Sequence, residues 1–289
     1  MNVLITGASG QLGRALVATA PTTAHVTARS HAQLDIGDVD AIERAFDSTQ
    51  PDVVINAGAY TDVDAAETEP AAATACNTDG VRQIAVACER AGARLVHVST
   101  DFVFDGQKSR PYLPDDPPAP LNRYGISKRE GEKLAVAALG DQVCIVRTSW
   151  LYSSGGSSFV TRMLRMMREH DQLRFVSDQV GAPTWAGSLA PALWRAAEIQ
   201  LPGVHHWCDS GVASRYDFAV AIAEEALAVG LLSAMPEIMP ITSDEFPSRV
   251  RRPNYSVLDK TATEAALGMR ACHWRESLRR MLQAMAGRD

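Results

Sequence analysis

Tyr124 and Lys128 stand at the two ends of the segment Tyr-Gly-Ile-Ser-Lys. Residues four apart share one face of a helix, so both side chains can act on the same group. The chain has only four lysines, which makes a chance pairing of tyrosine and lysine a weak explanation. A free phenol is a poor acid at neutral pH, but a neighbouring ammonium favours the phenolate and lowers the pKa of the phenol. The spacing therefore predicts an acid/base pair, with a surface pair on an amphipathic helix as the alternative.

Three glycines, Gly7, Gly10 and Gly13, follow the first apolar run of the chain and open a helical stretch. A dinucleotide-binding loop requires this context of strand, loop and helix. The first glycine would permit a tight turn, the second would let the backbone approach a pyrophosphate, and the third would allow close helix packing. The helix N-terminus would add amide donors and positive potential. A dinucleotide cofactor is thus predicted, against a glycine-rich turn with no ligand.

Short apolar runs rich in β-branched residues alternate with helical stretches along the first half of the chain. Runs that are apolar on both faces predict parallel strands covered by helices on both sides. The expected fold is α/β, a Rossmann-type doubly wound parallel sheet with a smaller α/β substrate-binding domain. The candidate strands are Val3–Thr6, Ala24–Ala28, Val53–Asn56, Leu95–Ser99 and Val143–Thr148.

The alternation of strands and helices weakens after about Tyr152. We therefore expect a dinucleotide-binding domain over residues 1–152 and a mainly substrate-binding domain over residues 153–289, with segments near 172–209 returning to the sheet. The second half should hold helices near 159–169, 189–199, 217–229 and 274–285 and strands near 173–176 and 204–208. The Pro-rich stretch 111–120 cannot continue a helix or a central strand, so we expect a loop that leads into the Tyr124 helix.

The composition limits the partners and the compartment. A chain of 289 residues, 46% hydrophobic and 21% charged, has the size and type of a globular enzyme. Its formal net charge of -6 gives no general attraction to nucleic acid. Five scattered cysteines without metal-ligand spacing predict reduced thiols, no metal site and a cytoplasmic protein. The N-terminal residues begin a strand and the apolar runs are short, so neither an export signal nor a membrane span is expected.

A further segment makes the likeness to a known family specific. Ser99-Thr100-Asp101-Phe-Val-Phe-Asp-Gly lies 24 positions before Tyr124, counted from Thr100. With it, the chain resembles the dTDP-4-dehydrorhamnose reductase family of extended short-chain dehydrogenase/reductases, a superfamily in which the glycine spacing GxxGxxG is typical. The likeness runs nearly end to end, through Leu34-Asp35-Ile36, the segment 56–64, Arg147-Thr-Ser-Trp150, the segment 178–184 and Arg252-Pro253.

The resemblance implies a cofactor site made from several segments. Gly10, Gln11 and Leu12 would line the pyrophosphate, Asp35 and Ile36 would flank the adenine, and residues 57–61 would pass under the adenosine and the nicotinamide ribose. For Asp35, a role as a helix N-cap partner is the alternative. The complete expected set is Gly7, Gly10, Gln11, Leu12, Gly13, Arg29, Asp35, Ile36, Ala57, Gly58, Ala59, Thr61, Ser99, Tyr124 and Lys128.

Arg29 bears on the choice between NADPH and NADH. An acidic residue directly after the second strand would bind the ribose diol of NAD, whereas here that strand ends in Arg29-Ser30. We therefore expect NADPH to be preferred and NADH also to be accepted. A solvated surface arginine is the alternative.

The reaction implied by the resemblance is reduction of the C4 ketone of dTDP-4-dehydro-6-deoxy-L-mannose to dTDP-L-rhamnose, the last step of dTDP-rhamnose biosynthesis. Tyr124 would give the proton, and Lys128 would lower the pKa of Tyr124 and bind the nicotinamide ribose. Thr100 would hydrogen-bond the ketone oxygen, with Ser99 assisting.

The substrate-binding residues expected are Thr100, Asp101, Trp150 and Arg252. Trp150 would stack on the sugar beside Asp101, with a buried tryptophan at the domain junction as the alternative. Arg252 matches the Arg-Pro of the family and, with Arg249 and Arg251, would clamp the diphosphate. A solvated basic loop is the alternative for these arginines.

Two other functions remain open, namely reduction of another dTDP-4-keto sugar and a non-catalytic regulatory subunit that binds a dinucleotide and a partner enzyme. The intact Thr100, Tyr124 and Lys128 favour catalysis. Some members of the family are metal-bridged dimers that use acidic residues on the first helix. The corresponding stretch here, residues 14–16, has no acid, so we expect no metal and a monomer or weak homodimer.

Overall fold

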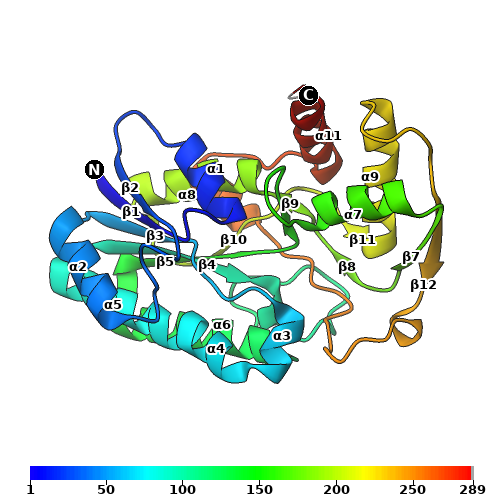
Figure 1. Cartoon of the computed structure of the whole chain (residues 1–289). Coiled ribbons are helices and arrows are strands. Elements are labelled where there is room, and N and C mark those ends of the chain that lie inside the picture. Colours follow the sequence, from blue (N-terminus) through cyan, green and yellow to red (C-terminus); the bar gives the residue numbers. More distant parts are fainter. Residues whose placement is uncertain (288–289) are drawn as a thin grey trace.

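The computed structural model describes residues 1–287, and a six-stranded parallel sheet lies at its centre (Figure 1). The strand order is β10-β5-β4-β3-β1-β2, and every neighbouring pair is parallel. The order reverses direction between β1 and β3, and ligands of such sheets bind at the carboxyl ends of the strands beside this point. The strands are β1 (Asn2–Thr6), β2 (His25–Arg29), β3 (Val53–Asn56), β4 (Arg94–Thr100), β5 (Val143–Thr148) and β10 (Gly203–His206).

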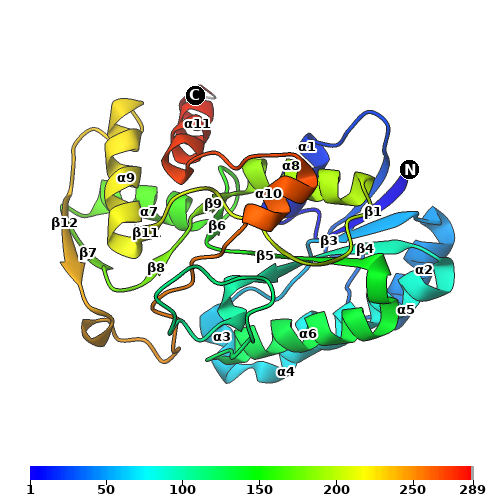
Figure 2. The same ribbon diagram turned by 180° about the vertical axis from the view of Figure 1, so that it is seen from behind.

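Helices cover both faces of the sheet, and the two layers can be followed in Figures 1 and 2. On one face Ile5 packs in an apolar cluster with residues of α1 and α8, and on the other face Leu4 packs with residues of α2, α5 and α6. Consecutive side chains of a strand point to opposite faces, which explains this division. The predicted Rossmann-type fold is confirmed. The helices are α1 (Gln11–Ala18), α2 (Val39–Thr49), α3 (Val63–Thr68), α4 (Pro70–Thr74), α5 (Val81–Ala91), α6 (Arg123–Leu139) and α8 (Ala186–Glu198), with a π-helical turn η1 (Ala75–Gly80) and 3-10 turns η2 (Asp101–Val103) and η3 (Gly140–Gln142).

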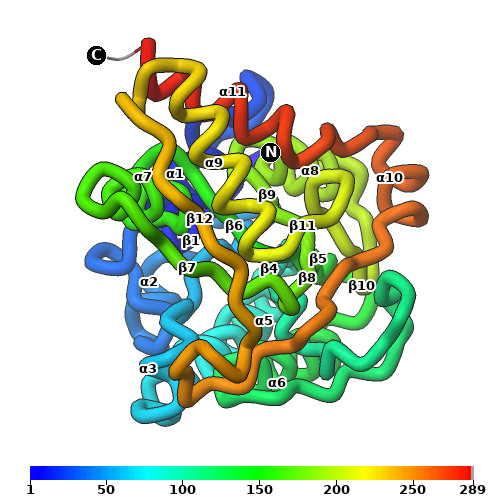
Figure 3. Tube along the Cα trace, turned by 90° about the vertical axis from the view of Figure 1, so that its right-hand side faces the viewer, coloured from blue at the N-terminus to red at the C-terminus, as the bar shows by residue number. Residues whose placement is uncertain are grey.

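A separate apolar core lies among α7, α9 and α11, around Tyr152, Phe218 and Leu278. Short strands pair beside it: β12 with β7, β11 with β8 and β6 with β9. Figure 3 shows β7 and β12 side by side. These elements are α7 (Phe159–Glu169), α9 (Arg215–Ala228), α10 (Thr261–Leu267), α11 (Trp274–Ala286), β6 (Leu151–Tyr152), β7 (Gln172–Val176), β8 (Val180–Gly181), β9 (Thr184–Trp185), β11 (Ala213–Ser214), β12 (Glu237–Ile241) and η4 (Ser243–Glu245).

The second half of the chain returns to the central sheet only in part. β10 pairs with β5, and α8 packs on the sheet, as expected. β7, which we expected in the same returning segment, pairs with β12 instead, so this part of the prediction is wrong. A short apolar run indicates a strand but does not indicate which sheet it joins. The boundary at residue 152 stays a prediction, and residues 288–289 of the expected second domain lie outside the described residues.

The Pro-rich stretch 111–120 contains no helix, as predicted, and it leads into α6, which begins at Arg123. The side-chain oxygen of Asn122 accepts a hydrogen bond from the Gly125 N–H at 2.8 Å and so caps the helix. The amide nitrogen of the same side chain donates to the Arg251 carbonyl at 3.0 Å. The first turn of α6, which carries Tyr124, is thereby tied to a segment that comes from the second core.

Candidate active site

The loop from Gly7 to Gly13 fits tightly between β1 and the segment after β3. Gly7 has φ +66°, and a Cβ there would lie 2.7 Å from the Gly58 nitrogen. A Cβ at Gly13 would lie 2.2 Å from the Gly7 carbonyl oxygen, and one at Gly10 would lie 3.1 Å from the same atom. The loop therefore needs glycine at Gly7 and Gly13, and its bare backbone leaves room for a pyrophosphate to approach.

The N-terminus of α1 offers unpaired hydrogen-bond donors. Its first helical bond runs from the Arg14 N–H to the Gly10 carbonyl at 3.1 Å, so the amides of Gln11, Leu12 and Gly13 have no partner in the helix. The Oε1 atom of Gln11 is buried and has no hydrogen-bond partner within residues 1–287. Together with the positive end of the helix, the free amides of the first turn fit the pyrophosphate of a dinucleotide.

The end of β2 lies beside this loop. The Arg29 carbonyl accepts a hydrogen bond from the Ala8 N–H at 2.9 Å, and the Arg29 guanidinium forms no ion pair with any described residue. Asp35 accepts a hydrogen bond from the Gly37 N–H at 2.9 Å, whereas Asp38 caps α2. The alternative role of Asp35 as the cap of that helix is therefore wrong.

The segment after β3 lies on the other side of the loop. A Cβ on Gly58 would lie 3.2 Å from Thr6 Oγ1 and 3.5 Å from the side chain of the buried Ile36. The Gly58 N–H donates to Asn56 Oδ1 at 3.1 Å. Of the other residues predicted in this segment, Ala57 and Ala59 are half-buried and Thr61 is exposed. The structure thus brings the predicted cofactor segments together at the carboxyl ends of β1, β2 and β3.

α6 brings Tyr124 to the end of β4. A Cβ on Gly125 would lie 2.2 Å from the Phe102 carbonyl oxygen, so glycine allows the helix to come this close. The rings of Tyr124 and Phe102 meet edge to face with 5.7 Å between their centroids. Thr100, the last residue of β4, lies near enough for its hydroxyl to influence the phenol. Two of the three predicted catalytic residues are therefore adjacent.

Burial raises the pKa of Tyr124 to about 12. The Thr100 hydroxyl favours the phenolate and so opposes this shift. The lowering that we expected from Lys128 is absent. Lys128 Nζ instead donates to the Val98 carbonyl at 2.7 Å. The Tyr124 hydroxyl consequently keeps its proton at neutral pH, which is the state that a proton donor needs.

Lys128 is buried in the layer between α6 and β4, and burial lowers its pKa to about 8. Its Nζ lies 3.4 Å from Nε2 of His97. Burial and the charge of Lys128 hold the pKa of His97 well below its ordinary value, so the imidazole is neutral. His97 Nδ1 lies 3.1 Å from Asn56 Nδ2, and Asn56 in turn holds the backbone of Gly58. The only sequence signal for His97 was the alternation that turns every second residue of β4 toward α6.

Ser99 faces away from the reacting groups. Its hydroxyl donates to Glu132 Oε1 at 2.5 Å, and Glu132 is paired with Arg147 at 2.8 Å and with Arg129 at 2.8 Å. We expected Ser99 at the cofactor, but its side chain belongs to this buried charged cluster between α6, β4 and β5. Consecutive residues of a strand face opposite sides, so Ser99 and Thr100 cannot both face the site.

Asp101 lies directly after Thr100 and is fully buried. Its Oδ2 accepts a hydrogen bond from the Ser256 hydroxyl at 2.5 Å. Burial raises the pKa of Asp101 to about 6, although Ser256 and the charge of Arg215 oppose the shift. The carboxylate is therefore largely ionised at neutral pH, and its other oxygen, Oδ1, accepts a hydrogen bond from the Thr100 hydroxyl at 3.2 Å.

Trp150 follows β5 with φ +45°, and one face of its ring is covered. The guanidinium carbon of Arg215 lies 3.4 Å from the ring centroid. A Cβ on Gly181 would lie 2.6 Å from Cε2 of the indole, so that residue also packs closely against the ring. Arg215 was not predicted, because nothing in the sequence connects the start of α9 with the end of β5.

The three arginines of the predicted clamp do not converge. Arg252 donates to Asp64 Oδ2 at 2.7 Å and to Ser248 Oγ at 2.6 Å, whereas Arg251 is exposed. Arg249 lines a cavity of about 490 Å³ that opens between α3 and residues 246–249. Figure 3 shows the chain after β12 descending to α3, where the ion pair of Arg252 joins the two parts of the molecule.

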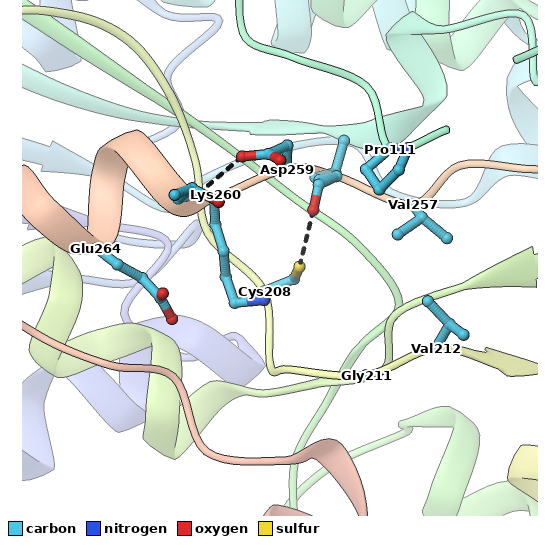
Figure 4. Close-up of a pocket in the computed structure, with 10 residues that line it drawn as sticks. Pro111, Cys208, Gly211, Val212, Val257, Asp259, Lys260 and Glu264 are labelled. Atoms are coloured by element: carbon cyan, nitrogen blue, oxygen red, sulfur yellow. Dashed lines mark hydrogen bonds between the residues drawn. The ribbon is translucent and has the colours of Figure 1, made fainter. Parts of the chain in front are cut away.

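A second cavity, of about 200 Å³, is lined by Cys208, Lys260 and Glu264 among others and by none of the predicted site residues (Figure 4). Residues 1–287 contain no group of three His, Cys, Asp or Glu side chains that could hold a metal ion. The five cysteines are unpaired. No helix in this part of the chain is long and apolar enough to cross a membrane.

Comparisons with known proteins agree with this arrangement. The family model described as RmlD substrate binding domain matches residues 1–286. The chain is 42% identical over 282 residues to the spore coat polysaccharide biosynthesis protein SpsK of Bacillus subtilis, with 97% of this chain and 96% of the relative covered. It is 40% identical over 286 residues to a dTDP-4-dehydrorhamnose reductase of Burkholderia thailandensis, with 95% and 96% covered.

A crystal structure of dTDP-4-dehydrorhamnose reductase from Bacillus anthracis in complex with NADP superposes with a TM-score of 0.91 at 33% identity, covering 96% of this chain and 97% of that one. The resemblance seen in the sequence is thus confirmed over nearly the whole length. The chain belongs to the RmlD family of dTDP-4-dehydrorhamnose reductases.

Proposed function

We propose that this chain reduces the C4 ketone of dTDP-4-dehydro-6-deoxy-L-mannose to dTDP-L-rhamnose, with NADPH preferred and NADH accepted. The observation that carries the proposal is that Tyr124 and Thr100 are adjacent at the carboxyl end of β4, on the same edge of the sheet as the glycine loop that follows β1. The name of the Burkholderia relative supports reduction of this ketone, and the NADP of the Bacillus anthracis structure supports the cofactor.

The residues at the end of β4 have separate roles in this reaction. NADPH, when held by the Gly7–Gly13 loop, supplies the hydride to C4. Tyr124 gives its phenolic proton to the C4 oxygen, and the Thr100 hydroxyl donates a hydrogen bond to the same oxygen. The Lys128 ammonium, which persists below its pKa of about 8, binds the nicotinamide ribose.

Under this proposal the sugar lies between Tyr124 and Asp101, and its diphosphate extends toward Arg252. Trp150 lies beside the sugar at the end of β5. The cofactor is held by Gly7, Gly10, Gln11, Leu12, Gly13, Arg29, Asp35, Ile36, Ala57, Gly58, Ala59, Thr61, Tyr124 and Lys128. The five unpaired cysteines support a cytoplasmic location, and a monomer or weak homodimer is the proposed assembly.

Product analysis tests the proposal. The enzyme is given the keto sugar and NADPH that carries deuterium at the transferred position, and the product is examined by NMR. Deuterium at C4 of dTDP-L-rhamnose is the expected result. Deuterium in the C4 epimer would contradict the proposed product, and dinucleotide binding without transfer would favour the regulatory subunit.

A further inference from the structure

Arg215 and Trp150 form a unit at the junction of the two cores. Arg215 is the first residue of α9, and its guanidinium lies flat enough on the indole to bring its carbon 3.4 Å from the ring centroid. Trp150 has φ +45°, a conformation that bulky residues adopt only where the surrounding structure holds them. Because Gly181 packs closely against the same ring, the indole is a fixed support for the guanidinium.

The guanidinium of Arg215 lies within electrostatic range of Asp101 but is bonded to no anion among the described residues. Within residues 1–287 it forms no hydrogen bond and no ion pair, whereas Arg147 is paired with Glu132 and Arg252 with Asp64. Burial lowers the pKa of Arg215 to about 9, the Asp101 carboxylate opposes this shift, and the charges of Arg252 and Arg162 add to it. A partly buried cation with free donors is a strong site for an anion.

The neighbours of Arg215 indicate which anion could bind to it. Its charge acts on Asp101, which adjoins Thr100, and it is itself influenced by Arg252. Asp64, the partner of Arg252, lines the cavity of about 490 Å³ beside α3. A nucleotide sugar with its C4 atom at Tyr124 would extend along this path, and the first charged group beyond the sugar is the phosphate that carries it.

We infer that Arg215, supported by Trp150, binds the phosphate to which the sugar is attached, so that Trp150 acts through Arg215. The inference rests on the proposed function, because it takes a nucleotide sugar as the substrate. Arg215 presents its donors in a planar fork that suits phosphate oxygens, and stacking on Trp150 fixes the plane of that fork. Arg252, which already bonds Asp64 and Ser248, has fewer donors left for the diphosphate.

Binding of dTDP and dTMP to the full-length protein tests the inference, because in dTDP-sugars the sugar is carried by the second phosphate, which dTMP lacks. In Arg215→Met the side chain can still pack on Trp150 but has no charge. We expect its Kd for dTDP to rise about 10- to 100-fold, the equivalent of one or two charged hydrogen bonds. Its Kd values for dTMP and NADP should stay at the wild-type level.

Arg165→Met, at an exposed position of α7, is the matched control and should bind dTDP like the wild type. Arg215→Lys, which retains the charge without the fork, should fall between wild type and Arg215→Met and serves if the methionine variant does not fold. Unchanged dTDP affinity, or an equal loss for dTMP, would overturn the inference. A wild-type protein that binds no dTDP at all would instead contradict the proposed function.

Discussion

At the scale of single residues, burial shifts the pKa values of the two central side chains in opposite directions, because in each it disfavours the charged form. It raises the pKa of Tyr124 to about 12 and lowers that of Lys128 to about 8. At neutral pH the phenol is protonated and most of the amine is charged. The spacing of the two residues led us to expect that Lys128 lowers the pKa of Tyr124. The shift has the opposite direction because the phenol is buried beside Phe102, which only the structure shows.

The rate should therefore depend on the charge of Lys128. Its pKa in the folded protein is lower than the usual value of about 10.4, so the ammonium is present below about pH 8 and is lost above it. We expect kcat to fall above pH 8. Lys128→Arg, whose side chain stays charged, should be slower but should lack this fall. A wild-type kcat that stays level up to pH 10 would contradict the role assigned to Lys128.

At the scale of elements, local sequence patterns predicted the central strands and the turn of the expected cofactor site. Apolar runs marked the central strands, and the glycine spacing marked the turn from β1 into α1. The partner of β7, the burial of the Ser99 side chain against Glu132 and the stack of Arg215 on Trp150 were not predicted. Each of these depends on contacts between segments far apart in the chain, which propensity and periodicity do not encode.

The end of β2 sets the expected choice of cofactor. Arg29 lies beside the glycine loop with no ionic partner among the described residues, so its charge is available for the 2′-phosphate of NADPH. In Arg29→Ala we expect KM for NADPH to rise about 10- to 100-fold, as for the loss of a charged hydrogen bond, while KM for NADH changes little. Initial rates with each cofactor give the ratio, and an unchanged ratio would make Arg29 a solvated surface residue.

At the scale of the whole molecule, buried ion pairs and hydrogen bonds hold α6, which carries Tyr124, in place between the sheet and the second core. Glu132 of α6 binds Arg147 of β5 and Ser99 of β4, and the Arg147 guanidinium also donates to the Pro114 carbonyl of the Pro-rich loop at 3.1 Å. Asn122 and the pair of Arg252 with Asp64 connect the same region to the segment after β12. The site is therefore built by both halves of the chain.

Removing the charge of Glu132 should destabilise the fold. Glu132→Gln leaves the buried Arg147 without a counter-charge, and we expect a loss of about 3–5 kcal/mol in the free energy of unfolding, measured with urea. Glu130→Gln, two residues earlier on the exposed side of α6, breaks only a surface pair with Lys133 and should cost little. Equal losses in the two variants would mean that the buried cluster does not stabilise α6.

The most direct measurement is NADPH oxidation at 340 nm with dTDP-4-dehydro-6-deoxy-L-mannose, comparing the wild type with Tyr124→Phe. The variant keeps the ring against Phe102 and removes only the acidic hydroxyl. Loss of a general acid lowers rates by about 10²–10⁴, so turnover should nearly disappear while NADPH still binds. A variant that reduces the sugar at the wild-type rate would contradict the assignment of Tyr124 as the proton donor.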